Sequence, residues 1–378
     1  MRRVMSYTSA GRSVSEAFAR PGFFLRATLL SGGLVLASVL GAGMSASQTT
    51  ATSNSPANGG NRQPVEAARA VLELFDTYQV VGMNSAHRMK DLDDFILSLI
   101  RNPAFPSVVD DVVVECGNSL YQETLDRYIA GEDVPLSDAR QVWRNTTQPM
   151  CGVSAFYEQL FPLIRRINER LPPGLRLRVV AGDPPIDWNA VKTESEVKAF
   201  LSNRDATIAT VMESEVLAKR RKALMLFGIG HLTHAPNINA ASAGLKIPET
   251  AVARYEKRYP GVTFVIDQYS GAGCGSAGSS STIPAVAAFE ARLPSMAVPS
   301  LVFAKETGVA TFGRIDGYLY LGPRDLVLAE LRPASVFVDQ TFMAELNRRA
   351  ALMAAGLNNQ IEPDYVREQD SSPFLYCR

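Results

Sequence analysis

From residue 64 onward, short apolar runs of strand length alternate with longer segments whose apolar residues recur at helical spacing. We expect strands at 79–82, 108–114, 175–180, 223–227, 263–267 and 316–321. The expected helices lie at 65–75, 92–100, 119–130, 137–144, 153–171, 206–221, 249–259 and 340–355. Strands that alternate with helices form largely parallel sheets covered on both faces. The sequence therefore predicts the α/β class, with a largely parallel (mixed) sheet and helices on both faces.

The first 46 residues are of a different kind. Several arginines precede an apolar stretch at 27–42, small residues follow as far as Ala46, and a polar tract covers 47–63. This layout is typical of a secretory signal followed by a linker. The alternative is an N-terminal membrane anchor, because the apolar stretch is about as long as a bilayer requires. We expect an exported protein, periplasmic or extracellular, that contacts a membrane only if this segment is not cleaved.

The remaining residues are expected to form a single domain at 64–358, interrupted by a Gly/Ser loop at 271–282 and followed by a polar tail at 359–378. Lys and Arg number 38 and are balanced by 38 Asp and Glu, so the chain lacks the basic excess that nucleic-acid binding requires. We therefore expect a small-molecule or peptide ligand and no nucleic acid.

The chain has four cysteines, Cys116, Cys151, Cys274 and Cys377, which are able to form disulfides in an exported protein. Three pairings are possible and the spacing does not choose among them. No CxxC motif is present, which excludes a zinc ribbon or a thioredoxin-type site.

Two of the expected strands end in the same way. Residues 79–82 run into a small-residue turn that ends at His87, and residues 223–227 run into Gly228-Ile229-Gly230-His231. In open α/β sheets, ligands bind beyond the carboxyl ends of the strands. We therefore expect both histidines in one crevice, where an imidazole is suited to act as a general base or a metal ligand.

Two further strands end on carboxylates. Glu115 follows a strongly apolar run, where an unpaired charge is costly, so it is predicted to be a site residue, with a structural salt bridge as the alternative. Asp183 is a candidate for binding substrate or for holding a site residue in place, and the alternative is that it caps its turn. Arg88 is a candidate for binding an anionic substrate group. His234 is expected to have a structural role or to support a site residue without contacting substrate.

Several motifs of known chemistry are absent. The chain has no Walker loop, no G-x-S-x-G elbow and no HExxH. Residues 271–276 begin like a dinucleotide-binding loop, but Ser276 takes the place of the last glycine and serine-rich sequence follows in place of a helix.

Paired G-x-x-H-like turns with a glutamate after the intervening strand resemble the superfamily of erythromycin esterases, Tiki/TraB proteins and ChaN-type haem-binding lipoproteins. The resemblance covers roughly residues 65–355 and extends to exported, erythromycin-esterase-like bacterial proteins. Further similar segments are 114–118, 126–128, 142–144, 181–188 and 319–323. The resemblance implies that His87, Glu115 and His231 are catalytic, or together bind a divalent metal. Haem is the other cofactor that it implies.

The first motif departs from the family pattern, because Ser85 stands where a glutamate is usual. This replacement removes a charge and a strong proton acceptor, and leaves Ser85 to bind substrate or orient water. Two hypotheses follow. The first is an exported hydrolase of ester, amide or peptide bonds, His-based or metal-assisted. The second is a catalytically inactive member that binds haem, a metal or an envelope ligand.

Overall fold

The computed structural model describes residues 65–87, 89–235, 249–269, 284–296, 298–308, 311, 313–322, 326–328, 330, 332–356 and 374–376. The predicted leader or anchor, the linker and the Gly/Ser loop lie outside these residues and stay predictions. Of the predicted polar tail, only β10 (Phe374–Tyr376) is described, and it pairs antiparallel with β9 (Leu326–Leu328). Within the described ranges, we find no helix with the length and apolar character needed to span a bilayer.

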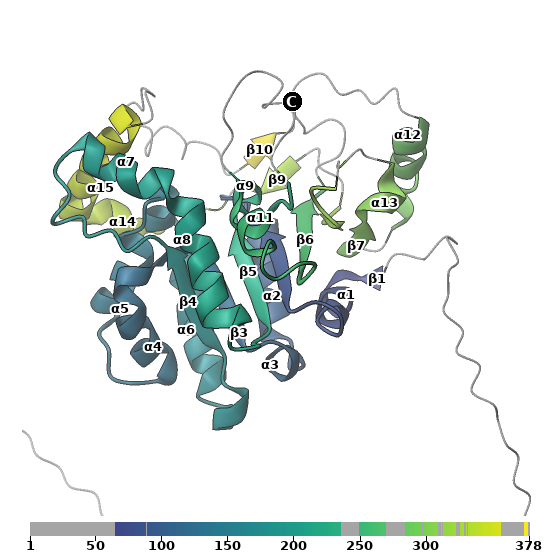
Figure 1. Cartoon of the computed structure of the whole chain (residues 1–378), viewed down its shortest axis with the longest axis horizontal. Helices are drawn as coiled ribbons and strands as arrows, with labels where there is room; N and C mark the ends of the chain where they lie inside the picture. Colours follow the sequence, from purple (N-terminus) through teal and green to yellow (C-terminus); the bar gives the residue numbers. More distant parts are fainter. Residues whose placement is uncertain are drawn as a thin grey trace, which may run out of the picture. The chain divides into compact units, whose positions relative to one another are not determined.

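The main sheet has eight strands, most of them parallel (Figure 1). Five neighbouring pairs are parallel, and only the pairs that involve β7 are antiparallel. In spatial order the strands are β1 (Val65–Glu66), β7 (Ser300–Phe303), β8 (Gly317–Tyr320), β6 (Thr263–Gln268), β2 (Val80–Asn84), β5 (Ala223–Phe227), β3 (Asp111–Asn118) and β4 (Arg178–Asp183). The predicted α/β class with a mixed, largely parallel sheet is confirmed.

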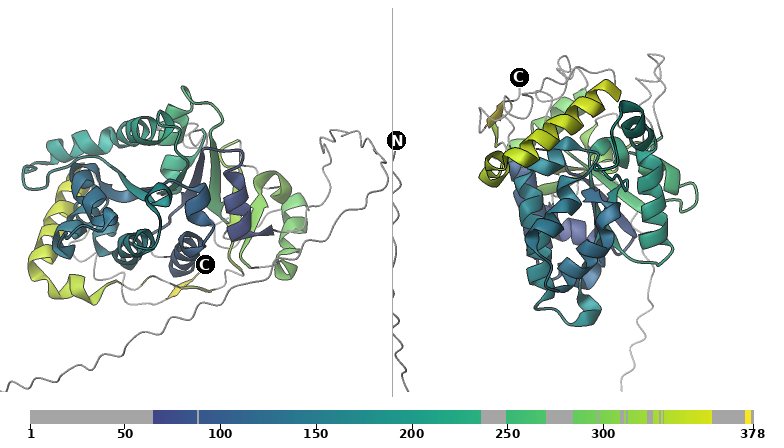
Figure 2. Two further views of the ribbon diagram at one scale, coloured as in Figure 1. Left: turned by 90° about the horizontal axis from the view of Figure 1, so that it is seen from below. Right: turned by 90° about the vertical axis from the view of Figure 1, so that its left-hand side faces the viewer.

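Helices cover both faces of this sheet (Figure 2). Because side chains alternate along a strand, Leu224 and Leu226 of β5 join one buried cluster, and Met225 and Phe227 join the other. The first face carries α1 (Ala67–Leu74), α2 (Lys90–Arg101), α3 (Phe105–Val108), α4 (Gln122–Ala130), α5 (Leu136–Arg144) and α6 (Ala155–Asn168). The second carries α8 (Arg204–Val211), the π-helical turn η4 (Met212–Leu217), α9 (Ile229–Leu232) and α11 (Ala251–Tyr255).

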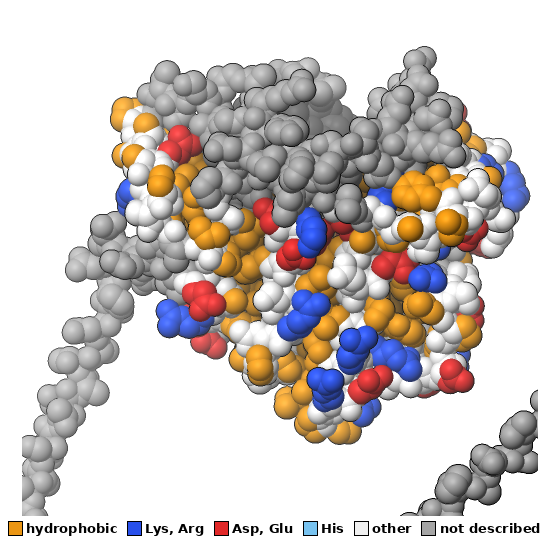
Figure 3. Space-filling view, turned by 180° about the vertical axis from the view of Figure 1, so that it is seen from behind, with side chains coloured by type: hydrophobic (Ala, Val, Ile, Leu, Met, Phe, Trp, Pro, Cys, Tyr) orange, Lys and Arg blue, Asp and Glu red, His pale blue; other side chains and the backbone are white. Residues whose placement is uncertain are grey.

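A smaller group of helices lies beyond β4. Helix α7 (Glu194–Ser202) packs on α15 (Gln340–Gly356), and α14 (Ala334–Val338) precedes α15. Trp188 and Met353 are buried in the cluster between them. Two short helices, α12 (Pro284–Glu290) and α13 (Ala304–Thr307), lie near β7. On the face seen in Figure 3, acidic and basic side chains are interspersed.

A disulfide joins Cys116, in β3, to Cys151, in the 3₁₀ helix η2 (Pro149–Val153). This is one of the pairings that the sequence left open; Cys274 and Cys377 lie outside the described residues. Both bonded cysteines are fully buried. The bond therefore ties the strand end that carries Glu115 to the loop that follows α5.

The register of the parallel strands brings their carboxyl ends to one edge. Asn84 of β2 pairs with Phe227 of β5, and Val114 of β3 pairs with Leu226. Beyond Val114 the register with β4 shifts, so that Asp183 pairs with Asn118. The turns after these four strands therefore lie side by side, as the sequence analysis requires.

Candidate functional site

Four of the predicted site residues converge at this edge of the sheet. His87 follows β2, Glu115 lies in β3, Asp183 ends β4 and His231 lies in α9, directly after β5. The Nε2 atom of His231 is 3.9 Å from Oε1 of Glu115, and the charge of Glu115 acts on the pKa of His87. The strand-end argument therefore holds for the positions of these residues, and their roles stay predictions. Arg88, the remaining candidate at this turn, lies outside the described residues.

Arg204, at the start of α8, joins three of these residues, Glu115, Asp183 and His231, and the sequence analysis did not single it out. Its Nε donates to Asp183 Oδ1 and its Nη2 donates to Glu115 Oε1, both at 2.9 Å. Its Nη1 lies 3.2 Å from His231 Nε2. The Arg204 side chain is only 12% exposed, so one buried guanidinium links two buried carboxylates and a histidine. We call Glu115, Asp183, Arg204, Asp205 and His231 the Arg204 network.

Glu115 is ionised in this network. Burial alone would raise its pKa, but Arg204, His87, His231 and the backbone N–H of Gly228 together lower it to about 2. The Gly228 N–H donates to Oε2 at 2.6 Å, while Arg204 occupies Oε1. Both oxygens of Glu115 therefore have strong donors. Glu115 is a fixed negative charge at neutral pH.

Asp183 is fully buried and receives three hydrogen bonds. The backbone N–H and the hydroxyl of Thr147 donate to its two oxygens at 2.5 and 2.7 Å, and Arg204 provides the third. Burial raises the pKa of Asp183 despite these donors. Asp183 thus holds Arg204 in place and connects it to the loop after α5. It does not merely cap its own turn.

His231 is held on both ring nitrogens. Asp205 Oδ1 lies 2.8 Å from Nδ1 and also accepts the backbone N–H of Ala251 at 2.9 Å. Because a carboxylate only accepts hydrogen bonds, Nδ1 of His231 carries the proton. The lone pair on Nε2 then accepts from Arg204. In this arrangement the Nε2 lone pair of His231 is engaged by Arg204, and the catalytic role expected of His231 stays a prediction.

The surroundings of His87 differ from those of His231, whose two ring nitrogens are both engaged. The His87 ring makes no hydrogen bond to any part of the chain that the structure describes, and the residue is partly exposed. Burial lowers its pKa most, and Arg204 and His231 lower it further, while Glu115 acts in the opposite direction. His87 is therefore a neutral imidazole at pH 7 with a lone pair that is not engaged by these residues.

The two histidine turns are fixed to each other by the backbone and by Asn84. The N–H of Ser85 donates to the Phe227 carbonyl at 2.9 Å, and the N–H of Ile229 donates to Asn84 Oδ1 at 3.1 Å. Asn84 in turn donates to Asp267 Oδ1 at 2.7 Å. Ser85, between these two turns in the chain's contacts, is buried.

His234 lies outside the network. Its Nδ1 is 2.7 Å from Glu256 and its Nε2 is 2.7 Å from Asp316. Burial lowers its pKa, but the hydrogen bonds to Asp316 and Glu256 outweigh this effect and raise the pKa to about 9. His234 is therefore an imidazolium that fastens the segment after α9 to its neighbours, as expected of a structural residue.

The predicted metal ligands do not fit a metal ion. A cation bound by His87, Glu115 and His231 needs Oε1 of Glu115 and Nε2 of His231, and the Arg204 guanidinium interacts with both atoms. Among the residues with described positions, no group of three His, Cys, Asp or Glu side chains is arranged to hold a metal. Haem stays a prediction.

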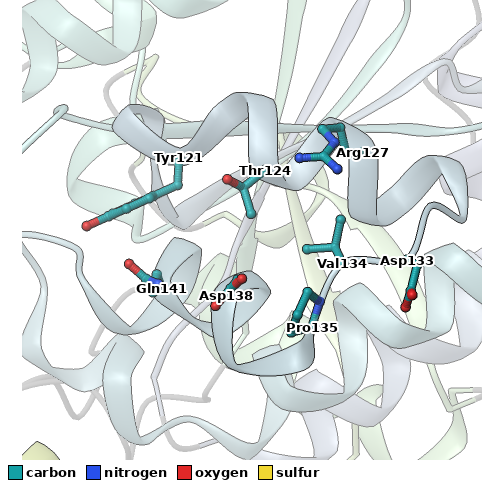
Figure 4. Close-up of a pocket in the computed structure, with 8 residues that line it drawn as sticks. All are labelled: Tyr121, Thr124, Arg127, Asp133, Val134, Pro135, Asp138 and Gln141. Atoms are coloured by element: carbon teal, nitrogen blue, oxygen red, sulfur yellow. The ribbon is translucent and has the colours of Figure 1, made fainter.

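A hollow of about 460 Å³ lies elsewhere, between α4 and α5 (Figure 4). It is lined by Tyr121, Thr124, Arg127, Asp133, Val134, Pro135, Asp138 and Gln141. None of these residues belongs to the Arg204 network. The hollow therefore adds nothing to the chemistry at the strand ends.

No family model and no curated protein matches this chain. Solved structures similar to it include an erythromycin esterase mutant in its open conformation, at 11% identity and a TM-score of 0.44 over 68% of this chain and 93% of the other. A Bacillus cereus protein is similar at 13% identity and a TM-score of 0.37, over 55% and 72%. A third is a haem complex of ChaN from Campylobacter jejuni, at 10% identity and a TM-score of 0.28, over 55% and 87%. An erythromycin esterase and ChaN are two of the kinds of protein that the sequence motifs resemble.

Proposed function

We propose that this chain is an exported hydrolase of ester, amide or peptide bonds, in which His87 is the general base. The observation that carries the proposal is the contrast between the two histidines. His231 is engaged by Asp205 and Arg204 through both nitrogens, whereas His87 is neutral and makes no hydrogen bond to the described residues. Export is inferred from the predicted leader.

In this reaction His87 removes a proton from water, the water oxygen bonds to the carbonyl carbon, and the carbonyl oxygen takes up the electron pair. When that pair returns, the bond from carbon to the leaving group breaks. The His87 imidazolium then gives its proton to the leaving oxygen or nitrogen. Glu115 favours the imidazolium, because its negative charge raises the pKa of His87. Such proton transfer typically contributes about 10²–10⁴-fold in rate.

Arg204 is suited to stabilise the oxyanion that forms on the carbonyl. A guanidinium has five N–H donors, and the contacts to Asp183, Glu115 and His231 engage three of its nitrogens with one hydrogen bond each. Nη1 and Nη2 thus each keep one further N–H. Preorganised donors of this kind are typically worth 10²–10³-fold each.

The second candidate is a protein that binds a small molecule without turnover. Ser85 favours it, because a hydroxyl replaces the glutamate of the resembled motif and the first histidine turn has lost a charge. In that case the crevice binds a ligand and the rate of hydrolysis does not depend on His87.

The test is turnover of a panel of esters, anilides and peptides by the full chain, beside His87→Gln and His234→Gln. We expect turnover by the natural chain, a loss of about 10²–10⁴-fold in His87→Gln, and retained turnover in folded His234→Gln. A folded natural chain that hydrolyses none of the panel, or a His87→Gln variant with unchanged turnover, refutes the proposal.

A further inference from the structure

The chain leaves β5 through a turn that both neighbouring strands hold. Strand β5 lies between β2 and β3. From β3, Glu115 Oε2 accepts the N–H of Gly228 at 2.6 Å. From β2, Asn84 Oδ1 accepts the N–H of Ile229, the next residue, at 3.1 Å. The N–H of His231 in turn donates to the Gly228 carbonyl at 2.9 Å, so the position of His231 depends on both contacts.

A carboxylate on a third strand fixes the orientation of the Asn84 amide. The backbone N–H of Ile229 can only donate, so it faces Oδ1 of Asn84, and Nδ2 of Asn84 then donates to Asp267 Oδ1 at 2.7 Å. Asp267 lies in β6, on the side of β2 away from β5, and its Oδ1 also accepts the N–H of Gln268 at 2.8 Å. A flipped amide would place an N–H donor against the N–H of Ile229. Asn84 therefore keeps one orientation.

The chemistry of this position favours asparagine. Asn84 is only 8% exposed, so its side chain has to satisfy both neighbours without help from bulk water. The N–H of Ile229 needs an acceptor, and the Asp267 carboxylate needs a donor. Leucine has the same approximate shape and offers neither, while aspartate offers two acceptors.

We propose that Asn84 and Asp267 form a positioning pair that sets the turn of His231, and with it the contact of Glu115, against the turn of His87. The proposal rests on the proposed function, because it concerns the alignment of the general base with the groups that assist it. Neither member of the pair touches the reacting atoms in this role. A misalignment of about 1 Å in a catalytic site can lower the rate about 100-fold.

The experiment compares the full chain with Asn84→Asp, Asp267→Asn and the double variant. In Asn84→Asp, two carboxylates face each other where an amide nitrogen and a carboxylate oxygen are 2.7 Å apart in the natural chain. In Asp267→Asn, the new amide oxygen can still accept from Asn84. In the double variant, an amide again faces a carboxylate with the two exchanged, and the net charge is that of the natural chain.

Asn84→Leu and Asn168→Asp are the controls. Asn84→Leu adds no charge, so it separates the loss of hydrogen bonds from an added charge. Asn168 is buried like Asn84, and its amide both donates to the carbonyl and accepts from the N–H of Leu177, each at 2.8 Å. Leu177 directly precedes β4, so this amide lies away from the carboxyl ends of the strands. We measure kcat, KM and urea unfolding for each variant.

We expect kcat to fall about 10- to 100-fold in Asn84→Asp and in Asn84→Leu, with KM within about threefold of the natural value. Asp267→Asn should keep its kcat, and the double variant should recover most of the loss seen in Asn84→Asp. Asn168→Asp should lose stability and keep its kcat. The inference is overturned if Asn84→Asp keeps the natural kcat, or if adding Asp267→Asn restores none of the loss.

Nitrogen-15 NMR of the His231 ring separates this inference from the proposed function. If the natural chain has no turnover, the proposed function fails, and the NMR signals alone decide on the pair. The pair then stands if Asn84→Asp shifts the His231 signals and the double variant returns them toward their natural values. His231 signals that are the same in all these variants refute it.

Discussion

Replacing Arg204 with methionine is the sharpest test of the network, because it removes the one cation shared by Glu115 and Asp183. Methionine has a similar length and no charge. The variant leaves two fully or almost fully buried carboxylates, each without its guanidinium partner. We expect a large loss of stability and a change in its pH dependence.

The size of the loss follows from the pKa of Glu115. Its usual value of 4.5 falls to about 2 in the folded chain, and a shift of this size corresponds to about 3 kcal/mol. Arg204 is the foremost of the groups that lower this pKa, and it also holds Asp183. Removing one partner of a buried ion pair typically costs 3–5 kcal/mol, which is the loss we expect at pH 7.

The same pKa shift makes the loss of stability depend on pH. A carboxylate whose folded pKa is lowered stabilises the fold above its unfolded pKa, here 4.5, and this stabilisation is lost as the pH falls toward 2. In the variant the two buried carboxylates lack their cation, so they take up protons at a higher pH. The cost of burying them as unpaired charges therefore becomes smaller as the pH falls from 7 to 4.5. The stability difference between natural chain and variant is therefore larger at pH 7 than at pH 4.5.

The assay is urea unfolding followed by circular dichroism at both pH values. Arg258→Met is the control, because the Arg258 side chain is 72% exposed in its ion pair with Glu213. This substitution should lower the free energy of unfolding by no more than about 1 kcal/mol. The reasoning is refuted if Arg204→Met costs no more than this control, or if its penalty is the same at pH 4.5 and 7.

Three further changes test neighbouring parts of the structure. His234 has a pKa of about 9 in the folded chain against a usual 6.5, so its ion pairs stabilise the fold by at most about 3 kcal/mol below pH 6.5, and this stabilisation disappears as the pH rises through 9. In His234→Gln the urea midpoint should therefore change less with pH than in the natural chain. Equal pH dependence of the two midpoints would contradict the assignment. In Asp205→Asn the new amide can donate a hydrogen bond to His231 Nδ1, whereas Asp205 only accepts one, so the histidine can adopt the other tautomer. Turnover should then fall at least about tenfold. An unchanged kcat would show that Asp205 does not contribute to the site. The double change Cys116→Ala and Cys151→Ala opens a loop with a sequence separation of 35, and should cost about 3–4 kcal/mol in urea unfolding; a cost below about 1 kcal/mol would show that the disulfide contributes little.

The sequence predicted the architecture and the convergence of four strand ends because both depend on local pattern. Apolar runs that end at small residues marked the strand ends, and a parallel sheet necessarily places such ends at one edge. His87, Glu115, Asp183 and His231 were found in this way. Their convergence needed no knowledge of any tertiary contact.

The bounds of two strands were less well predicted, because distant contacts set them. The strand expected at 108–114 is Asp111–Asn118, since Phe105–Val108 forms a helical turn and Arg221 pairs with Asp111 at 2.7 Å. The strand expected at 175–180 begins at Arg178. The alternation there included Leu175, which is 43% exposed.

Arg204 was missed because nothing near it in the sequence marks it. Its three partners lie 21, 27 and 89 residues away in the sequence. Two neighbouring charged residues such as Arg204 and Asp205 at the start of a helix are common and do not mark a site. Helix α7 was also missed, although Thr193 and Glu196 form a capping box that signals its start.

The claim on which the account depends is that His87 is a neutral imidazole beside a network that holds His231 in one tautomer. Nitrogen-15 NMR of the three histidine side chains between pH 4 and 10 tests it without any substrate. We predict that the pKa of His87 lies below its usual 6.5, that His234 titrates at about 9, and that the neutral ring of His231 carries its proton on Nδ1. A protonated His87 at pH 7, or a His231 that exchanges between tautomers, would contradict the account.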